Sequence, residues 1–123
     1  MANLSVSDIR PFIPAQDFEQ SKLFYSSLGW TVKDVGDGLA LVELQDAHFY
    51  IQNYYIKDVA ENAMLHITVQ DARAWHQHVS AVLEGKKFPQ ARVQPPKLQP
   101  YGAIVTFVHD PTGVLLHLCQ WKP

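Results

Sequence analysis

The sequence predicts an α+β fold built from two similar halves, each with the order strand, helix and three strands. An apolar stretch, then Gln-Asp, then an amphipathic segment occurs at Asp17 and again 54 residues later at Asp71. A second pair of similar segments, residues 38–46 and 102–110, follows in the same order. The length of 123 residues suits one domain and is too short for two ordinary ones. We therefore expect a single domain, residues 1–123, made of two modules at about 1–56 and 62–123.

The two predicted helices begin at the repeated aspartates. The carboxylates of Asp17 and Asp71 can each accept a hydrogen bond from a backbone N–H in the first helical turn. In each half, apolar residues then recur at the spacing of a helix with one buried face. In the first half they are Phe18, Leu23, Phe24 and Leu28, and in the second half Ala72, Trp75, Val79 and Val82. Gly29 and Gly85 mark the expected helix ends.

Turn residues separate the predicted strands. Residues 36–38, Gly-Asp-Gly, form a turn between two strands, and residues 110–113, Asp-Pro-Thr-Gly, have β-turn composition. Residues 86–100 contain four of the eight prolines and predict a long loop, with one irregular strand near 91–93. The last strand of each half is expected at residues 48–54 and 114–121.

Composition excludes several functional classes. Ten Lys and Arg against twelve Asp and Glu give a net charge of −2, which favours neither nucleic acid nor anionic lipid as a partner. No apolar run approaches the ~18–20 residues of a membrane span, and residues 1–10 lack a signal-peptide pattern. The single Cys119 excludes an internal disulfide framework and a cysteine-based zinc site. We expect a soluble cytoplasmic domain.

Several motifs resemble the vicinal oxygen chelate superfamily of glyoxalases, bleomycin-resistance proteins and extradiol dioxygenases. The opening segment Arg-Pro-Phe-Ile-Pro-Ala-Gln-Asp at residues 10–17 is followed by Phe-Tyr and Leu-Gly-Trp at residues 24–25 and 28–30. Residues 64–71 with Ala-Trp at 74–75, and Asp-Pro-Thr-Gly at 110–113 leading to His117, match the second half. Length and the segment 49–55 are most similar to the bleomycin-resistance branch.

The resemblance also implies how the two modules are arranged, which local periodicity does not. It implies two βαβββ modules, each a curved mixed sheet, that close around a cleft. In the bleomycin-resistance branch two chains exchange modules and form a homodimer with two clefts. The sequence leaves open whether the modules of this chain pair within or between chains.

Metal-dependent enzymes of the superfamily hold a divalent cation with four strand residues, mostly His, Glu or Gln. The matching positions here are Arg10, Met64, His117 and Tyr50, or Phe49 if the register differs by one residue. A guanidinium offers no lone pair, and a thioether is a poor ligand for a hard cation. The resemblance therefore favours a protein without a catalytic residue, metal or other cofactor. Whether the chain is an enzyme is left uncertain, leaning towards no.

Two metal alternatives stay open at this stage. His48, His66 and His117 could form an unconventional site, because strand alternation places His48 beside Tyr50 and His66 beside Met64. A divalent-metal-dependent enzyme, such as a lyase, isomerase, dioxygenase or thiol transferase, would use His66 and His117.

The favoured function is antibiotic resistance of the bleomycin-resistance type. The chain would sequester an aromatic or chelate-type compound in a metal-free cleft, with a second copy of itself as its other partner. Arg10 is interpreted either as an anion-binding cation or as a surface residue paired with Asp8 or Glu43. The residues predicted to bind the ligand point into the expected cleft or lie beside it: Arg10, Phe12, Tyr50, Gln52, Met64, His66, Tyr101, Phe107 and His117.

Overall fold

A computed structural model describes residues 2–122 of the chain. The first half forms a four-stranded mixed sheet in the order β1-β4-β3-β2, with β1 parallel to β4 and the other neighbours antiparallel. Its elements are β1 (Phe12–Pro14), α1 (Phe18–Ser27), β2 (Thr31–Gly36), β3 (Leu39–Leu44) and β4 (Ala47–Gln52).

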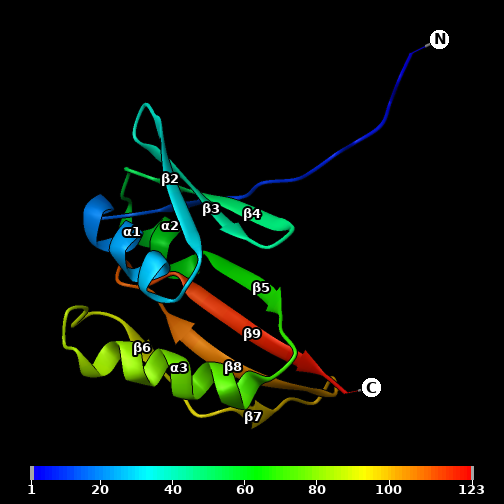
Figure 1. The fold of residues 1–123 in the computed structure, drawn as a ribbon, viewed down its shortest axis with the longest axis vertical. Coiled ribbons are helices and arrows are strands. Elements are labelled where there is room, and N and C mark those ends of the chain that lie inside the picture. The colour runs from blue at the N-terminus through cyan, green and yellow to red at the C-terminus, as the bar shows by residue number, and fades with distance from the viewer. Residues whose placement is uncertain (1, 123) are drawn as a thin grey trace.

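The second half repeats this arrangement. Its sheet has the order β5-β9-β8-β6, with β7 also paired to β8 and with β5 parallel to β9. Figure 1 shows α3 lying along this sheet. The elements are α2 (Lys57–Asn62), β5 (Met64–Thr68), α3 (Ala72–Glu84), β6 (Arg92–Val93), β7 (Lys97–Leu98), β8 (Ala103–His109) and β9 (Leu115–Trp121). The predicted α+β fold with two βαβββ units is confirmed.

The helix boundaries follow the capping signals in the sequence. The carboxylate of Asp17 accepts a hydrogen bond from the Gln20 N–H, and that of Asp71 accepts one from the Ala74 N–H, both at 3.0 Å. After α1 the chain turns at Gly29, whose φ of +98° is a conformation that favours glycine. None of the described helices is long and apolar enough to cross a membrane.

Two parts of the structure differ from the expectation. Helix α2 lies where the sequence indicated only a boundary between modules; no side chain caps its N-terminus, at Ile56. The segment 86–100, expected to hold one irregular strand, carries two short strands, β6 and β7, which pair with successive parts of β8. Pairing with an established neighbouring strand lets such short strands form without a strong pattern of their own.

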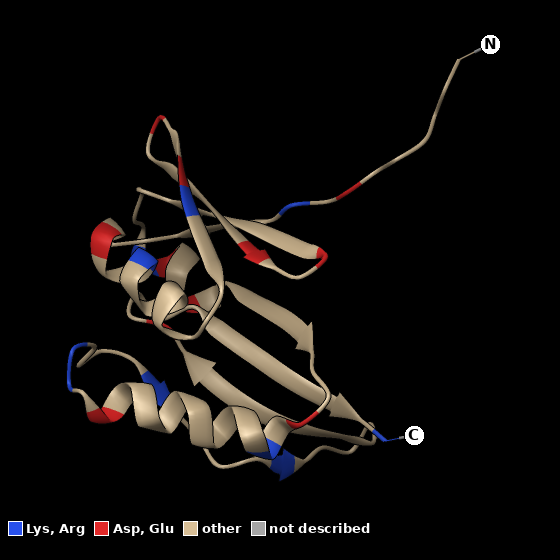
Figure 2. Cartoon of the chain, in the orientation of Figure 1, with Lys and Arg blue, Asp and Glu red and all other residues tan. Residues whose placement is uncertain are grey.

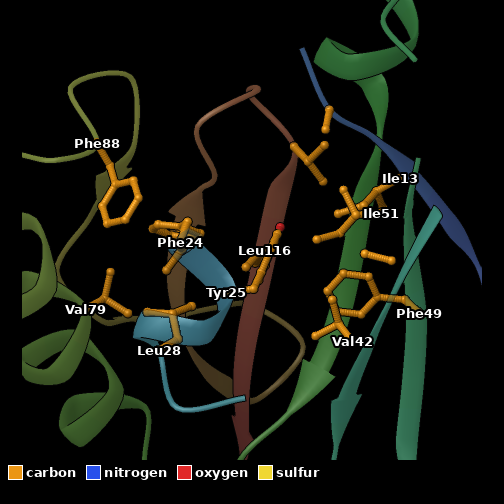
Figure 3. Packing of buried hydrophobic residues seen from close by; sticks show 14 of the residues in the cluster. Ile13, Phe24, Tyr25, Leu28, Val42, Phe49, Ile51, Val79, Phe88 and Leu116 are labelled. Carbon is orange, nitrogen blue, oxygen red and sulfur yellow. The ribbon is translucent and has the colours of Figure 1, made fainter. Parts of the chain in front are cut away.

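The hydrophobic core joins both halves through α1. Phe24 and Tyr25 of α1 are fully buried, and Figure 3 shows them with Phe88 on one side and with Leu116 of β9 and Phe49 and Ile51 of β4 on the other. On β4 and β9 the buried residues alternate with less buried ones. The intervening residues, Tyr50 and His117 among them, therefore point away from the core.

A buried hydrogen-bonded group fixes α1 to the turn between β8 and β9. The hydroxyl of Tyr25 donates to Asp110 Oδ2 at 2.7 Å. Oδ1 of the same carboxylate accepts the backbone N–H groups of Thr112, Gly113 and Val114 at 2.8–3.0 Å. Burial raises the pKa of Asp110 and also that of Tyr25. With its acceptor sites filled, this carboxylate is a structural group rather than a free acid.

Candidate ligand-binding site

The residues predicted to bind a ligand lie in two groups, one on each sheet. The first-sheet group is Arg10, Phe12, Tyr50 and Gln52, on or next to β1 and β4. The second-sheet group is Met64, His66, Tyr101, Phe107 and His117, on or next to β5, β8 and β9. The hydrogen bonds and ring contacts of the described residues connect members within each group and none across the two. The structure thus forms two half-sites rather than one closed pocket.

The first-sheet group combines a ring pair with a fixed cation. Phe12 and Tyr50 are register partners on β1 and β4, and their rings stack with centroids 5.0 Å apart. The guanidinium of Arg10 donates to the Tyr50 hydroxyl at 2.9 Å and to Asp8 Oδ2 at 2.8 Å. The hydrogen bond between them raises the pKa of Arg10 and lowers that of Asp8. Arg10 therefore pairs with Asp8, as one of the two interpretations expected. Its second hydrogen bond, to the Tyr50 hydroxyl, keeps the guanidinium on this face.

Charged neighbours extend the first-sheet group. His48 Nδ1 lies 3.1 Å from Asp8 Oδ2, without the geometry of a hydrogen bond. His48 is the register partner of Glu43 on β3, which in turn lies 2.8 Å from the Lys33 ammonium. The Lys33 ammonium holds the pKa of Glu43 below its usual value. This side of the site carries two ion pairs, Arg10 with Asp8 and Lys33 with Glu43.

The second-sheet group forms a row across three strands. His66 on β5 is the register partner of His117 on β9, which in turn pairs with Phe107 on β8. The Phe107 and His117 rings meet edge to face at 4.9 Å. Met64, one strand step away on β5, is 59% exposed. None of β5, β8 and β9 carries a charged side chain, as Figure 2 shows.

A second line of rings crosses this row and includes a residue that the sequence reasoning did not select. The Trp121 ring lies 5.7 Å from the His66 ring and 5.7 Å from the Tyr101 ring. Trp121 is four residues beyond His117 on β9, so strand alternation could have placed it on this face. Tyr101, Trp121 and His66 give a continuous ring surface.

Burial changes the pKa of two titratable groups on this face, His117 and Cys119. Burial, and then the neighbouring His66, lower the pKa of His117. Its Nε2 is buried without a hydrogen-bond partner. Burial raises the pKa of Cys119, whose sulfur lies 3.5 Å from His66 Nδ1. A buried thiol with a raised pKa is a packed neighbour of His66, not an activated nucleophile.

The four positions that hold a metal in enzymes of the superfamily do not fit one here. Arg10 and Tyr50 are hydrogen-bonded to each other, and Met64 offers a thioether. Of the four positions, His117 alone offers a nitrogen ligand. Across residues 2–122, no three His, Cys, Asp or Glu side chains lie close enough together to hold a metal ion. The alternative trio of His48, His66 and His117 does not form a ligand cluster, because His48 belongs to the first sheet and pairs towards Asp8.

A groove of about 940 Å³ lies between the two halves. It lies between the start of β4 and the outer edge of β5, and Trp30 and Trp75, whose rings are 5.5 Å apart, are among its lining residues. Of the predicted ligand-binding residues only His66 lines it. The groove therefore adjoins the second-sheet group at His66 and the charged neighbours of the first-sheet group at Glu43 and His48.

Comparison with known proteins gives matches in structure only. No family model matches the sequence, and no curated protein matches it either. Among solved structures, a bleomycin resistance determinant encoded on the transposon Tn5 superposes with a TM-score of 0.80 at 21% identity, over 96% of this chain and 100% of that one.

Two further matches are proteins that bind antibiotics. The bleomycin-binding protein of bleomycin-producing Streptomyces verticillus, solved with copper(II)-bleomycin, gives a TM-score of 0.79 at 20% identity, over 98% of this chain and 100% of that one. TnmS3, an antibiotic binding protein from Streptomyces sp. CB03234, gives 0.75 at 18% identity, over the same shares of the two chains. At these identities the likeness establishes the fold, and the chain has the fold of the bleomycin-resistance proteins, which fits the resemblance to the vicinal oxygen chelate superfamily.

Proposed function

We propose that this protein binds a small aromatic or chelate-type compound without altering it and thereby lowers the compound's free concentration. The observation that carries the proposal is the second-sheet group: a row of His66, His117 and Phe107 crossed by the rings of Tyr101 and Trp121. Aromatic contacts contribute about 0.5–1.5 kcal/mol each beyond the area they bury. Such a surface suits a planar ligand.

The first-sheet group supplies a different kind of contact. The guanidinium of Arg10 is held in place by Asp8 and Tyr50, and the stacked rings of Phe12 and Tyr50 lie beside it. A fixed guanidinium can engage a carbonyl, carboxylate or phosphate group of a ligand. A compound with a planar part and a polar end would use both groups.

We also propose that a second copy of the chain completes the site. Each group is open to solvent in a single chain, and Phe12, Met64, Tyr101 and Trp121 are all exposed. Exposed apolar groups gathered on one face indicate an interaction surface. In the homodimer, the first-sheet group of one chain would face the second-sheet group of the other. This arrangement is what the resemblance to the bleomycin-resistance branch implies.

A thermal-shift and calorimetric screen tests the binding function. The probes are bleomycin, copper(II)-bleomycin and a set of planar heteroaromatic compounds and metal chelates. We expect one class to raise the melting temperature and to titrate with one site per chain. The Trp121→Ala variant should show a weaker response, whereas Leu23→Ala, which removes an exposed side chain on α1, should keep it. Absence of any response in the wild type across the whole screen contradicts the proposal.

The competing function is a divalent-metal enzyme. It is favoured by one observation, the placement of His66 and His117 side by side on one face. Elemental analysis of protein purified without chelators separates the two functions. Near-stoichiometric zinc, nickel, manganese or iron in the wild type, absent from His117→Ala, would replace the binding function with the enzymatic one.

A further inference from the structure

The groove between the two halves has the size of a site for a small organic ligand. Its volume of about 940 Å³ lies within the roughly 300–1,000 Å³ of sites that hold drug-sized molecules. It runs between β4 of the first half and β5 of the second, which lie next to each other in Figure 1. All of its lining residues belong to one chain, so the groove is formed without a second copy.

Two half-buried tryptophan side chains line the groove. Trp30 follows α1 and Trp75 lies on α3, and their rings are 5.5 Å apart with an angle of 47° between their planes. The Trp30 ring also stacks on the buried Tyr25 ring at 5.9 Å, and the Trp75 and His78 rings meet edge to face at 5.4 Å. These contacts hold both indoles in place before a ligand arrives, which lowers the entropic cost of binding.

A further part of the lining is aliphatic and comes from β5 and the residue that follows it. Leu65, Ile67 and Val69 line the groove and pack against the core that joins the two halves. A flat ring system placed between indole rings and aliphatic side chains loses its contact with water on its faces, and this burial favours binding. The lining therefore suits a planar aromatic compound.

A row of polar side chains lies on the first-sheet side of the groove. Thr31, Glu43 and His48 are register partners on β2, β3 and β4, and all three line the groove. Oε1 of Glu43 is buried, and the Lys33 ammonium lies 2.8 Å from it. The Lys33 side chain is 60% exposed and does not line the groove. Because an ion pair with an exposed partner contributes little free energy, a cation inside the groove can compete with Lys33 for this carboxylate.

Apart from its histidines, the charged side chains of the groove lining are acidic. Among the described residues that line it are two carboxylates, Glu43 and Asp71, and no Lys or Arg. Oδ1 of Asp71 accepts the Ala74 N–H at 3.0 Å and so caps α3, which leaves Glu43 as the carboxylate that can engage a ligand. A positive charge on a ligand is attracted by this carboxylate and by the faces of the indole rings. An anion would instead meet two carboxylates.

We propose that the groove is a second ligand site of this protein and takes a planar aromatic cation, with the ring system of the ligand against Trp30 and Trp75 and its positive charge towards Glu43. This site lies within one chain, whereas the two half-sites need a second copy to meet. The inference therefore goes beyond the proposed function and does not rest on it.

Isothermal titration with three related probes in mildly alkaline buffer tests the ligand class. N-methylacridinium carries a fixed positive charge, acridine is its uncharged analogue under these conditions, and acridine-9-carboxylate is the anionic one. We expect N-methylacridinium to bind saturably and about 10-fold more tightly than acridine, and the carboxylate not to bind. Equal affinities for the three probes contradict the proposal. So does the absence of saturable N-methylacridinium binding, which is also the result expected if a second copy of the chain fills the groove.

Two charge variants with opposite expected effects test the role of Glu43. Glu43→Gln keeps the size of the side chain and removes its charge, so the affinity for N-methylacridinium should fall about 10-fold while that for acridine stays unchanged. Lys33→Met removes the competing ammonium and should raise the affinity for the cation about 3-fold. Glu19→Gln, which removes a carboxylate paired with Lys22 outside the groove, is the matched control and should change neither affinity. Unchanged cation binding in Glu43→Gln, or weaker binding in Lys33→Met, would overturn the assignment.

A bulky side chain inside the groove tests the location of the site. Ala74 is exposed on α3 and lines the groove, so Ala74→Trp fills the groove without removing a core contact. We expect this variant to lose N-methylacridinium binding and to keep its circular dichroism spectrum. Gln77→Trp, on an exposed position of α3 outside the groove, is the matched control and should bind the cation as the wild type does. Retained binding in Ala74→Trp would overturn the proposal.

Trp121→Ala separates this inference from the proposed function, because Trp121 belongs to the second-sheet face and does not line the groove. We expect this variant to bind N-methylacridinium as the wild type does. Loss of the cation in Trp121→Ala would assign it to the second-sheet group and overturn the groove site. Cation binding that Ala74→Trp abolishes and Trp121→Ala spares supports the groove site even if bleomycin and copper(II)-bleomycin give no response.

Discussion

The two sheet faces occupy equivalent places in the two halves and carry different chemistry. Five residues before the aspartate that caps the helix stands Phe12 in the first half and His66 in the second. Their register partners on the neighbouring parallel strand are Tyr50 and His117. A stacked ring pair beside a charged network therefore corresponds to a pair of imidazoles on two strands that carry no Asp, Glu, Lys or Arg.

The difference indicates that the two equivalent sheet faces would contact different parts of a ligand. The buried faces of β4 and β9 keep their apolar alternation because both must pack against the shared core. The opposite faces are free of this requirement, so one carries opposite charges that fix Arg10 and the other carries rings. We expect the first face to orient a polar group of the ligand and the second to supply most of the binding free energy.

The largest expected effect is on stability, and it comes from the buried hydrogen-bonded group of Asp110 and Tyr25, which joins the two halves beneath both faces. Asp110→Ala leaves the Tyr25 hydroxyl and three backbone N–H groups without their acceptor. An unsatisfied buried polar group costs about 1–3 kcal/mol, so we expect a loss of roughly 3 kcal/mol in the free energy of unfolding and a melting temperature lower by roughly 10 °C. Chemical denaturation and calorimetry measure both.

The control for this change is a variant that removes one hydrogen bond only. Tyr25→Phe keeps the ring in the core and should cost about 1–2 kcal/mol. If Asp110→Ala destabilised the protein no more than Tyr25→Phe, the backbone contacts of the turn would contribute little. The two faces would then not depend on a common structural group.

The second prediction tests the aromatic face, the second-sheet group. Trp121→Ala removes the ring that links Tyr101 with His66. Because Trp121 is 45% exposed, the change should hardly alter stability, whereas affinity for the best compound of the screen should fall about 10-fold, or ~1.4 kcal/mol. Isothermal titration measures the affinity. An unchanged affinity would remove the second-sheet group from the site.

The third prediction concerns the charged side. Arg10→Met keeps the length of the side chain and removes the guanidinium that bonds Asp8 and Tyr50. Arg10 is exposed, so the melting temperature should change by no more than a few degrees, while affinity falls about 3-fold. Lys33→Met, which removes the cation paired with Glu43, is the matched control. Equal effects of the two variants would assign the loss to net charge rather than to Arg10.

The sequence predicted the fold well because its signals are local. The two capping aspartates, the helical period and Gly29 each act within a few residues, and the strand alternation placed the candidate residues on the faces away from the core. Helix α2 gave no such signal, since Ile56 at its start cannot cap it and its six residues are too few for a clear period. Its position depends on contacts with β1 instead.

The candidate site was predictable only in part for a physical reason. Alternation decides which side of a strand a residue occupies, but the distance between two sheets depends on how the halves pack. The groove beside β5 and the separation of the two residue groups are of this second kind. Trp121 is the intermediate case, because the rule that placed His117 also applies to it.

The smallest expected effect is a pH dependence of stability that differs between the two faces. The pKa of His117 is lowered in the folded protein by burial and by His66, so the folded state resists protonation at this residue. Its contribution to stability is complete above the usual pKa of about 6.5 and is lost as the pH falls through the lowered value. The hydrogen bond that Asp8 accepts from Arg10 lowers the pKa of Asp8, and the Lys33 ammonium lowers that of Glu43, so the contributions of both carboxylates are lost only below about pH 4.

Melting curves between pH 8 and pH 3 should therefore show two separate regions. His117→Gln should flatten the decline between about pH 7 and pH 5 without abolishing it, because burial and Arg92 also lower the pKa of His109 on the same sheet. Asp8→Asn should alter the curve only below about pH 5. A decline between pH 7 and pH 5 that is unchanged in His117→Gln but flattened in Asp8→Asn would reverse the assignment, and the first face would then be the one that responds near neutral pH.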